Sequence, residues 1–329
     1  MSHPSYKHRV FILGCACFGI LLVFLVTRGC YSPYTWFPRE RLERPQGRAD
    51  LFMLVTLDGV RPDALARAKT PHFDELIDQG AYAEDALAVS PTLTLVNHAS
   101  MVSGVTPARH KVTWNTLSPI HGKIRVPTLF TLAKGYGLRT AIFAGKTKLQ
   151  HLDRKRDVDL FMMVGYDPEE VAAAVIQSIK ARPADVMLVH FAEPDGAGHA
   201  FGWMSVQQLE SIERCDKAFV KIVAALKDAR MYERAAFIIT SDHGGHDTTH
   251  GTDAREDMQI PWIAAGKGVP RGLRIKKPIF TYDTAATGAD LLGLEVPGSW
   301  RWEVRSIFKG RGAMVRDQAT GNRPGPQHP

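Results

Sequence analysis

The chain has 329 residues, of which 45% are hydrophobic and 23% are charged, and its formal net charge is +7. This is the balance of an ordinary globular protein, sufficient for one large domain or two small ones. Basic residues gather at 39–48 and 311–323, without the interleaved aromatic residues that a nucleic-acid-binding surface usually shows. We therefore expect no nucleic-acid polymer as a partner.

Residues 10–27, VFILGCACFGILLVFLVT, carry no charge and are flanked by Lys7, Arg9 and Arg28. As a helix this segment would span about 27 Å, close to the thickness of a bilayer core. A cleaved signal peptide is the alternative, but the TRGCYSP that follows is a poor cleavage site. We predict a short N-terminal segment, residues 1–9, and then a transmembrane signal anchor in a single-pass membrane protein. Its catalytic domain would lie outside the cytoplasm, facing the periplasm or at the cell surface.

Residues 28–50 are rich in Pro and Arg and are predicted to form a stalk, and strands and helices alternate from residue 51 onward. The predicted strands are apolar runs without in-out alternation, which is typical of strands buried on both faces. The pattern indicates a doubly wound α/β domain over residues 51–309, with a mostly parallel sheet flanked by helices, and a disordered tail at 310–329. This domain contains one cysteine, Cys215, which excludes a disulfide framework. Strands are predicted at 51–59, 138–145, 184–195 and 234–245, and helices at 70–80, 168–181, 205–229 and 282–294.

Three of the predicted strands finish in acidic stretches, VTLDG, HFAEPDGAGH and ITSDHGGHDTTHG. In open α/β sheets, ligands bind outside the carboxyl ends of the strands, so Asp58, Asp195 and Asp242 are expected to meet there. Each of them taken singly is better explained as a turn residue, because Asp-Gly is common in turns. Three similar strand ends, two with histidines attached, favour a shared site.

Histidines accompany two of these carboxylates. Asp195 and His199 lie in DGAGH, where the two glycines favour a close-fitting loop over a regular helix. SDHGGHDTTHG contains three histidines within eight residues. Carboxylate and imidazole together suit zinc, and two ions about 4 Å apart hold both the attacking and leaving oxygens of a displacement at phosphorus. The candidate ligands for two divalent metal ions are Asp58, Asp195, Asp242, His199, His243 and His250, with His246 in reserve.

The stretch SPTLTLVNHASMVSG, residues 90–104, reads as a turn that runs into a helix. Thr94 and Asn97 lie one helical turn apart at its start, next to His98. Helix capping is the simple interpretation, and Thr92 or Thr94 could serve in it. A hydroxyl at the positive end of the helix dipole also has its alkoxide form favoured.

The motifs LDGVRPD, SPTLTLVNHASMVSGVTPARH, EPDGAGHAFG and SDHGGHDTTHG, in this order over about residues 51–270, resemble the type I phosphodiesterase / nucleotide pyrophosphatase branch of the alkaline phosphatase superfamily. The resemblance implies an alkaline phosphatase-like fold and two zinc ions. It implies a threonine nucleophile at Thr94, which also contacts the first metal, and an oxyanion-contacting amide at Asn97. The first zinc would be held by Asp58, Asp242 and His243, and the second by Asp195, His199 and His250.

The sequence departs from the family pattern in two ways. The last histidine of the second metal set usually follows the SDHG motif at a much greater distance, whereas His250 lies seven residues after His243. We choose His250 over His246 because HGTDAREDMQIPWIAAG resembles the segment after that last histidine, and His246 remains the alternative. The domain is also short for this family and lacks the inserted segments that shape nucleotide pockets. The class of activity is therefore better supported than the identity of the substrate.

Other polar residues have weaker assignments. Lys146, in AGKTKL after a strand, is predicted to bind substrate, with a solvated lysine as the alternative. His98 is expected to be packed or hydrogen-bonded near the helix because the metal sets are already filled. His190 and Glu193, which lie near Asp195 in sequence, are candidates to support the metal ligands.

These observations predict a zinc-dependent hydrolase of phosphate esters that acts through a covalent phospho-threonine. Its substrate would be a nucleotide, a lipid headgroup or a sugar phosphate. The alternatives are a membrane-anchored phosphoryl-group transferase of the phosphoethanolamine-transferase type, a phosphomonoesterase or phosphonate hydrolase of the same superfamily, and an inert binding domain. A sulfatase is disfavoured because the chain has no C/S-x-P-x-R sequence around a modifiable residue.

Overall fold

A computed structural model describes residue 43 and residues 46–300. The predicted N-terminal segment 1–9, the anchor at 10–27, most of the stalk and the tail at 310–329 lie outside these residues and stay predictions. Within the part that is described, no helix has the length and apolar character needed to cross a bilayer.

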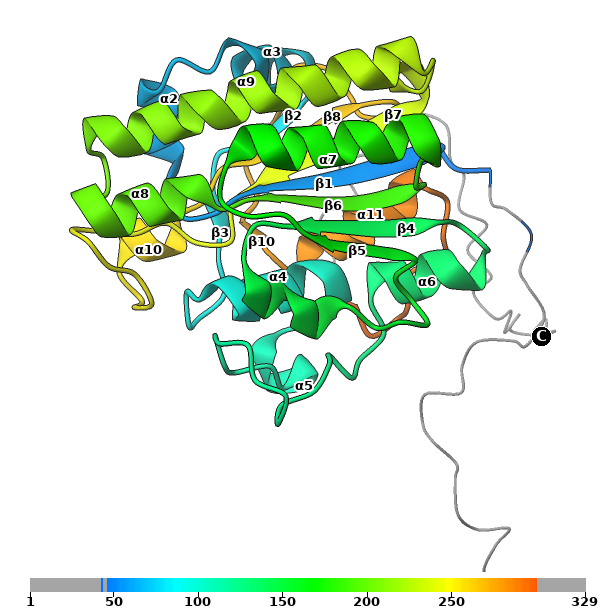
Figure 1. Ribbon diagram of the computed structural model, residues 1–329, viewed down its shortest axis with the longest axis horizontal. Coiled ribbons are helices and arrows are strands. Elements are labelled where there is room, and N and C mark those ends of the chain that lie inside the picture. Colours follow the sequence, from blue (N-terminus) through cyan, green and yellow to red (C-terminus); the bar gives the residue numbers. More distant parts are fainter. Residues whose placement is uncertain (1–42, 44–45, 301–329) are drawn as a thin grey trace, which may run out of the picture. The chain divides into compact units, whose positions relative to one another are not determined.

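An eight-stranded sheet forms the centre of the fold, with strand order β5-β4-β6-β1-β7-β8-β2-β9 (Figure 1). The five strands from β5 to β7 run parallel, and β8 pairs antiparallel with both β7 and β2. The predicted mostly parallel sheet is therefore confirmed. A separate pair joins β3 and β10. The strands are β1 (Leu51–Leu57), β2 (Ala81–Ala83), β3 (Ala86–Leu87), β4 (Thr140–Ala144), β5 (Leu160–Met163), β6 (Val186–Phe191), β7 (Ala235–Thr240), β8 (Trp262–Gly266), β9 (Leu273–Ile275) and β10 (Ile279–Phe280).

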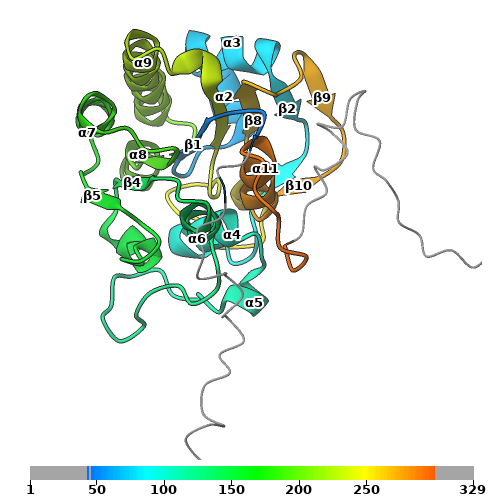
Figure 2. The ribbon, with the colours of Figure 1, turned by 90° about the vertical axis from the view of Figure 1, so that its right-hand side faces the viewer.

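Helices cover both faces of the sheet (Figures 1 and 2). One face carries α7, α9, α2 and α3, and the other carries α4, α6 and α11. The α-helices are α2 (Pro62–Arg67), α3 (Pro71–Gln79), α4 (Thr94–Ser103), α5 (Pro107–His110), α6 (Leu129–Gly135), α7 (Pro168–Ala181), α8 (Glu193–Phe201), α9 (Val206–Asp228), α10 (Arg255–Met258) and α11 (Asp283–Leu291). Two 3₁₀ helices, η1 (Thr147–Leu152) and η2 (Tyr232–Arg234), complete the described elements.

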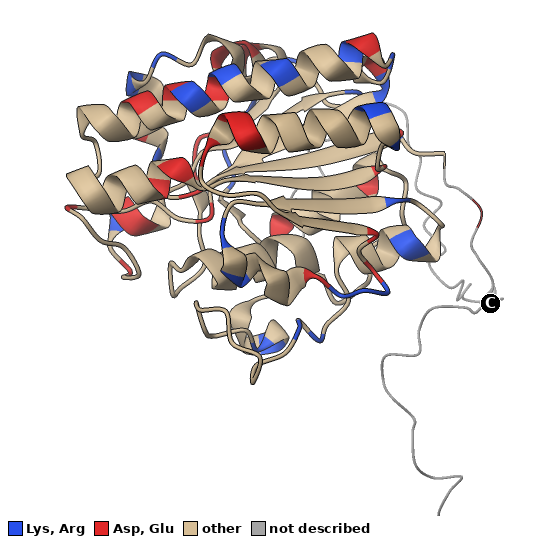
Figure 3. Cartoon of the chain, viewed as in Figure 1, with Lys and Arg blue, Asp and Glu red and all other residues tan. Residues whose placement is uncertain are grey.

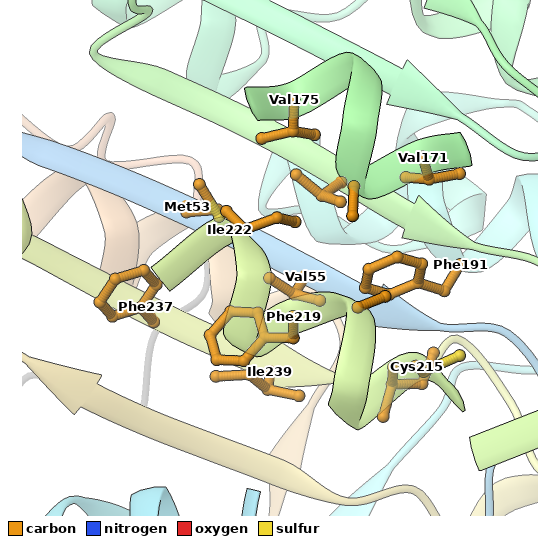
Figure 4. Packing of buried hydrophobic residues seen from close by; sticks show 14 of the residues in the cluster. Met53, Val55, Val171, Val175, Phe191, Cys215, Phe219, Ile222, Phe237 and Ile239 are labelled. Carbon is orange, nitrogen blue, oxygen red and sulfur yellow. The ribbon is translucent and has the colours of Figure 1, made fainter. Parts of the chain in front are cut away.

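The strands are apolar along their whole length because both of their faces are covered. All seven residues of β1 are buried. Met53 and Val55 pack with Phe191 of β6 and Phe219 of α9 in one large cluster (Figure 4). Charged side chains lie mostly on helices and at strand ends (Figure 3). The middle of the sheet therefore supplies a rigid apolar support, and the polar chemistry is confined to its edge.

The structure differs from the sequence prediction at the segment after β6. DGAGH was predicted as a loop, but it lies in α8, which begins at Glu193 with Pro194 in its first turn. Its glycines serve packing, since a Cβ at Gly198 would lie 2.9 Å from the ring of Trp203. A helix also puts residues i and i+4 on one face, so Asp195 and His199 point the same way.

Candidate active site and metal centre

The candidate residues converge at the carboxyl edge of four neighbouring strands. Asp58 follows β1, Asp242 follows β7, Asp195 lies in α8 after β6, and Lys146 follows β4. These strands are adjacent in the sheet order β4-β6-β1-β7, and α8 and α10 lie at this end of the sheet (Figure 1). The arrangement places ligands from distant parts of the chain in one site, as expected for an α/β sheet.

Three histidines present the same ring nitrogen to the site. The Nδ1 atoms of His199, His243 and His250 lie 2.9, 2.8 and 2.8 Å from the backbone carbonyls of Thr248, Gly244 and Thr92. A carbonyl accepts only, so each Nδ1 carries a proton, and in the neutral ring the lone pair is on Nε2. Such a second contact fixes the tautomer of a metal-binding histidine. All three rings are therefore oriented to bind a cation through Nε2.

Each of three carboxylates has one oxygen held by the protein and one without a partner. Asp58 Oδ2 contacts His190 and Lys146, Asp195 Oδ2 contacts Lys146, and Asp242 Oδ1 accepts from the N–H groups of Gly59 and His243. The other oxygens, Asp58 Oδ1, Asp195 Oδ1 and Asp242 Oδ2, are buried and accept no hydrogen bond. Buried charged acceptors without partners are costly, and a metal ion is one of the groups that satisfies them.

The distances between these free atoms match two metal sites. Ligand atoms 2.0–2.1 Å from a tetrahedral zinc ion lie about 3.4 Å from one another. His243 Nε2 lies 3.4 Å from Asp58 Oδ1, 3.3 Å from Asp242 Oδ2 and 3.5 Å from the Thr94 hydroxyl. In the second set, Asp195 Oδ1 lies 3.4 Å from His250 Nε2 and 3.5 Å from His199 Nε2. The residues present therefore fit a pair of divalent ions.

Asp195 lies between the two sets. Its ligand atom is within 4.8 Å of those of His199 and His250, and also within 4.8 Å of those of Asp58 and His243. We assign Asp242 to the first set because its free oxygen is the atom closest to His243 Nε2. His246 belongs to neither group, and its Nδ1 contacts Asp257 Oδ1 at 2.7 Å. The structure thus places His250, and not His246, with Asp195 and His199.

Thr94 is the first residue of α4 and is fully buried. Its carbonyl accepts a hydrogen bond from His98 Nδ1 at 2.8 Å, and the Nε2 of that ring accepts from the Thr56 hydroxyl at 3.0 Å. Burial lowers the pKa of His98 to about 4, against the opposing attraction of Asp242, so this ring is neutral. The prediction that His98 is packed beside the helix is confirmed, and Thr94 is fixed at the helix start.

The role predicted for Asn97 is wrong. Its side chain is fully buried, and Nδ2 donates to the carbonyls of Val89 and Pro91 at 3.0 and 3.2 Å. Its Oδ1 accepts from Val89 N–H and from the Thr281 hydroxyl. Three residues after Thr94, this side chain lies on the side of α4 that packs against the preceding loop, and both N–H groups have backbone acceptors. Asn97 therefore closes the turn before α4 and has no amide hydrogen left for a substrate.

A second asparagine, which the sequence analysis did not single out, lies beside the start of α4. Asn115 Oδ1 accepts the backbone N–H of Leu95 at 3.0 Å, next to Thr94. This contact holds the side chain at the start of α4 by its oxygen, and no hydrogen bond of its Nδ2 group is found among the described residues. Asn115 lies on the loop after α5, twenty-one residues from Thr94. No local spacing rule connects the two.

Lys146 contacts two of the carboxylates, whereas the sequence analysis predicted that it binds substrate. Its ammonium is 2.7 Å from Asp58 Oδ2 and contacts Asp195 Oδ2, and the side chain is buried. Burial disfavours its charge, but Asp58 and Asp195 raise its pKa above the ordinary lysine value. The same contact, together with His190, outweighs burial and lowers the pKa of Asp58 well below its usual range. Lys146 thus stays charged and joins the two metal sets through the oxygens that face away from them.

The two proposed supporting residues have different positions. The Gly145 N–H donates to His190 Nδ1 at 3.0 Å, so Nε2 carries the proton and donates to Asp58 Oδ2 at 2.8 Å. His190 therefore supports Asp58, a metal-facing carboxylate, as predicted. Glu193 instead pairs with Arg214 at 2.8 Å.

A sequence model of the family described as "Type I phosphodiesterase / nucleotide pyrophosphatase" matches residues 52–262, a range that contains every residue of the site. The chain belongs to this family. Human ectonucleotide pyrophosphatase/phosphodiesterase family member 7 is 25% identical over 222 residues, which cover 60% of this chain and 48% of that protein. Human family member 5 is 28% identical over 210 residues, with coverages of 58% and 44%. The chain thus spans about half the length of the curated relatives it matches.

Solved structures of the family share the fold. Murine ectonucleotide pyrophosphatase/phosphodiesterase 5, an inactive threonine-to-alanine variant in complex with AMP, has a TM-score of 0.67 at 16% identity over 78% of this chain and 99% of that chain. A 2-O GAG sulfatase has a TM-score of 0.64 at 17% identity, with coverages of 79% and 74%. The type I phosphodiesterase fold and the sulfatase fold are thus versions of one architecture, and this chain has that architecture.

Proposed function

We propose that this member of the type I phosphodiesterase family is a two-metal hydrolase of phosphate esters, with Thr94 as the nucleophile and zinc as the metal. One observation supports it above the others: three buried carboxylate oxygens without partners face three imidazole nitrogens at about 3.3–3.5 Å. Asp58, Asp242, His243 and the Thr94 hydroxyl would hold one ion, and Asp195, His199 and His250 the other. Imidazole with carboxylate favours zinc over the all-oxygen ligand sets of Mg²⁺ and Ca²⁺.

Bound there, the ions would supply Lewis acidity to the phosphoryl oxygens and lower the pKa of the Thr94 hydroxyl. Thr94 is the first residue of α4, so its oxygen lies at the positive end of the helix dipole, which favours the alkoxide. Thr94 Oγ1 forms the new bond to phosphorus, and the bond from phosphorus to the leaving oxygen breaks. Water then attacks phosphorus, the bond from phosphorus to Thr94 Oγ1 breaks, and the phosphate product leaves with the Thr94 hydroxyl restored.

Asn115 takes the role that the sequence assigned to Asn97. Because its oxygen is held by Leu95 N–H, its amide hydrogens are available beside Thr94 to donate to a non-bridging oxygen. A donor preorganised in this way contributes about 3–4 kcal/mol to a transition state. The neutral ring of His98 and the buried start of α4 keep Thr94 in place during the reaction.

Nucleotides are the substrate class that the relatives suggest. One bovine relative is named as a bis(5'-adenosyl)-triphosphatase, at 23% identity, and the murine neighbour binds AMP. Transfer to an acceptor alcohol and hydrolysis of monoesters use the same first step and remain the alternatives. The membrane anchor at 10–27 and a catalytic domain outside the cytoplasm are part of the proposal and rest on hydropathy and flanking charge. Carbonate extraction and protease protection of intact membranes test that part.

The proposal is tested with purified protein, metal analysis and a para-nitrophenyl phosphodiester. We expect two equivalents of zinc, turnover that a chelator abolishes, and no turnover by Thr94→Ala although this variant still binds metal. Asp242→Asn should lose metal from one site. Turnover by Thr94→Ala at the wild-type rate would refute the nucleophile, and full activity in chelator would refute the metal centre. Phosphoryl release only when an acceptor alcohol is added would indicate the transferase.

A further inference from the structure

Asp257 is a buried carboxylate that neither metal set includes. It lies on α10, and its side chain is fully buried. Its Oδ1 contacts His246 Nδ1 at 2.7 Å, and its Oδ2 accepts from the backbone N–H and the hydroxyl of Thr252 at 2.9 and 2.7 Å. Burial disfavours its charge, but the hydrogen bonds that His246 and Thr252 donate outweigh burial and lower its pKa. Asp257 thus differs from the three metal-facing carboxylates, each of which has one oxygen without a partner.

The two partners of Asp257 are the two ends of one loop. Residues 246–252, HDTTHGT, form this loop between β7 and α10. The backbones of His246 and Thr249 pair through two hydrogen bonds, and Asp247 has a φ of +44°, which is uncommon for residues other than glycine. A backbone of this kind keeps its shape when the surrounding structure fixes it. The side chain of Asp257 fixes the loop at both ends.

The 246–252 loop orients both histidines of the second metal set. His250 belongs to the loop, and its Nδ1 donates to the carbonyl of Thr92 at 2.8 Å. His199 lies on α8, but its Nδ1 donates to the carbonyl of Thr248 at 2.9 Å, and Thr248 is a loop residue. The loop therefore supplies one ligand of the second set and fixes the ring of another.

The first metal set is held by other contacts. His243 precedes the loop, and its Nδ1 lies 2.8 Å from the carbonyl of Gly244. Asp242 Oδ1 accepts from the N–H groups of Gly59 and His243. The Gly244 N–H donates to the backbone carbonyl of Asp257, a contact that a change of the Asp257 side chain leaves in place. A substitution of this side chain should therefore act on one metal set and not on the other.

We propose that Asp257 is a positioning residue that fixes the 246–252 loop and thereby sets the metal affinity of the second site, Asp195, His199 and His250. This inference rests on the two-metal centre of the proposed function and adds a carboxylate that touches neither ion. Groups that orient metal ligands typically contribute 10–100-fold to metal affinity. Loss of Asp257 should thus weaken the second site by about this factor and spare the first.

The test measures zinc affinity, by competition with a chromogenic chelator, in variants that each keep one metal set. His199→Ala keeps the first set, and Asp242→Asn keeps the second. We expect Asp257→Ala to weaken zinc binding about 10–100-fold in the Asp242→Asn protein and to leave it unchanged in the His199→Ala protein. Asp257→Asn should restore part of the affinity, because its amide oxygen can still accept from Thr252 while its N–H groups can donate to His246 Nδ1.

Two further variants separate positioning from general destabilisation. Glu256→Ala is the matched control, since it removes an exposed carboxylate from the same helix, and it should change neither affinity. Thr252→Val removes the hydroxyl contact of an exposed residue and should weaken the second site in the same direction as Asp257→Ala, by a smaller factor. Equal losses of affinity in both single-site proteins, or no loss in the Asp242→Asn protein, would overturn the inference.

Turnover separates this inference from the proposed function. With both metal sets intact, Asp257→Ala should need about 10–100 times more zinc for half-maximal hydrolysis of the para-nitrophenyl phosphodiester and should approach the wild-type rate at saturating zinc. A rate that stays low at saturating zinc, or an unchanged zinc requirement, would overturn the inference and leave the hydrolase intact. Wild-type protein that binds two zinc ions without turnover would instead refute the hydrolase, and the zinc affinities would still decide the role of Asp257.

Discussion

Lys146 is predicted to stabilise the metal-free protein because it compensates two buried carboxylates. Its ammonium lies 2.7 Å from Asp58 Oδ2 and also contacts Asp195 Oδ2, and all three side chains are buried. Removing one partner of a buried ion pair leaves an uncompensated charge and costs about 3–5 kcal/mol. Lys146→Met should therefore lower the Tm of chelator-treated protein by about 6–20 °C, given about 2–4 °C per kcal/mol for a domain of this size.

The pH of the measurement follows from the two pKa shifts. The pKa of Asp58 is lowered, so its contribution is present above the ordinary Asp pKa of about 4 and is lost as the pH falls through the folded value. The pKa of Lys146 is raised, so its contribution is present below about pH 10 and is lost as the pH rises through the folded value. The full effect is therefore expected near pH 7.

Thermal unfolding of wild type and Lys146→Met is compared in chelator and in zinc at pH 7. Zinc should reduce the difference, because the ions take over part of the compensation of the carboxylates. Lys134→Met is the matched control, since the Lys134–Asp159 pair is about one-third exposed at both side chains and its loss should cost less than about 1 kcal/mol. If Lys146→Met loses no more stability in chelator than Lys134→Met, the bridging role of Lys146 is refuted.

Three further predictions follow from the structure. Asn115→Ala should lower kcat of phosphodiester hydrolysis by about 10²–10³-fold with little change in Tm. Asn97→Ala should instead lower the Tm, because it leaves the carbonyls of Val89 and Pro91 unpaired, and the reverse pattern would restore Asn97 as the phosphoryl contact. Gly198→Ala should destabilise the fold and weaken metal binding, since its Cβ would lie 2.9 Å from the Trp203 ring beside His199, and an unchanged Tm in chelator would contradict this packing. Burial lowers the pKa of His110 to about 4, so the free energy of unfolding of the wild type should fall by about 3 kcal/mol as the pH falls from about 6.5 to 4. Urea unfolding of His110→Asn should lack this part of the pH dependence, and an identical pH dependence in the two proteins would show that His110 is not buried in its neutral form.

The sheet and the metal-facing residues could be predicted because their signals are local. Strands buried on both faces must be apolar throughout, so β1, β4, β6 and β7 stand out as short apolar runs. Their carboxyl ends meet at one edge, so the acidic residues that follow them converge. This reasoning brought Asp58 and Asp242 together although they lie 184 positions apart in the chain.

The errors arose where packing between distant segments decides the structure. DGAGH was predicted as a loop because glycine is a poor helix former. In the structure, the ring of Trp203 lies too close to residue 198 for a side chain there, and the helix keeps Asp195 and His199 on one face. Asn97 lies one turn after Thr94, but its side chain belongs to the loop before the helix. Asn115 reaches the same helix start from a loop whose course depends on contacts with η1.

The two oxygens of each carboxylate contact different groups, so Lys146 and a metal ion need not compete for the same oxygen atom. Lys146 and His190 use the Oδ2 atoms of Asp58 and Asp195, whereas the Oδ1 atoms of both residues face the histidine nitrogens. Asp242 repeats the pattern, with Oδ1 held by backbone N–H groups and Oδ2 left free. The ligand atoms are therefore fixed by contacts that metal binding does not break. A site held in this way exists in the folded chain before the ions bind. The free energy needed to bring the ligand atoms together is therefore supplied by folding of the sheet edge and not by metal binding.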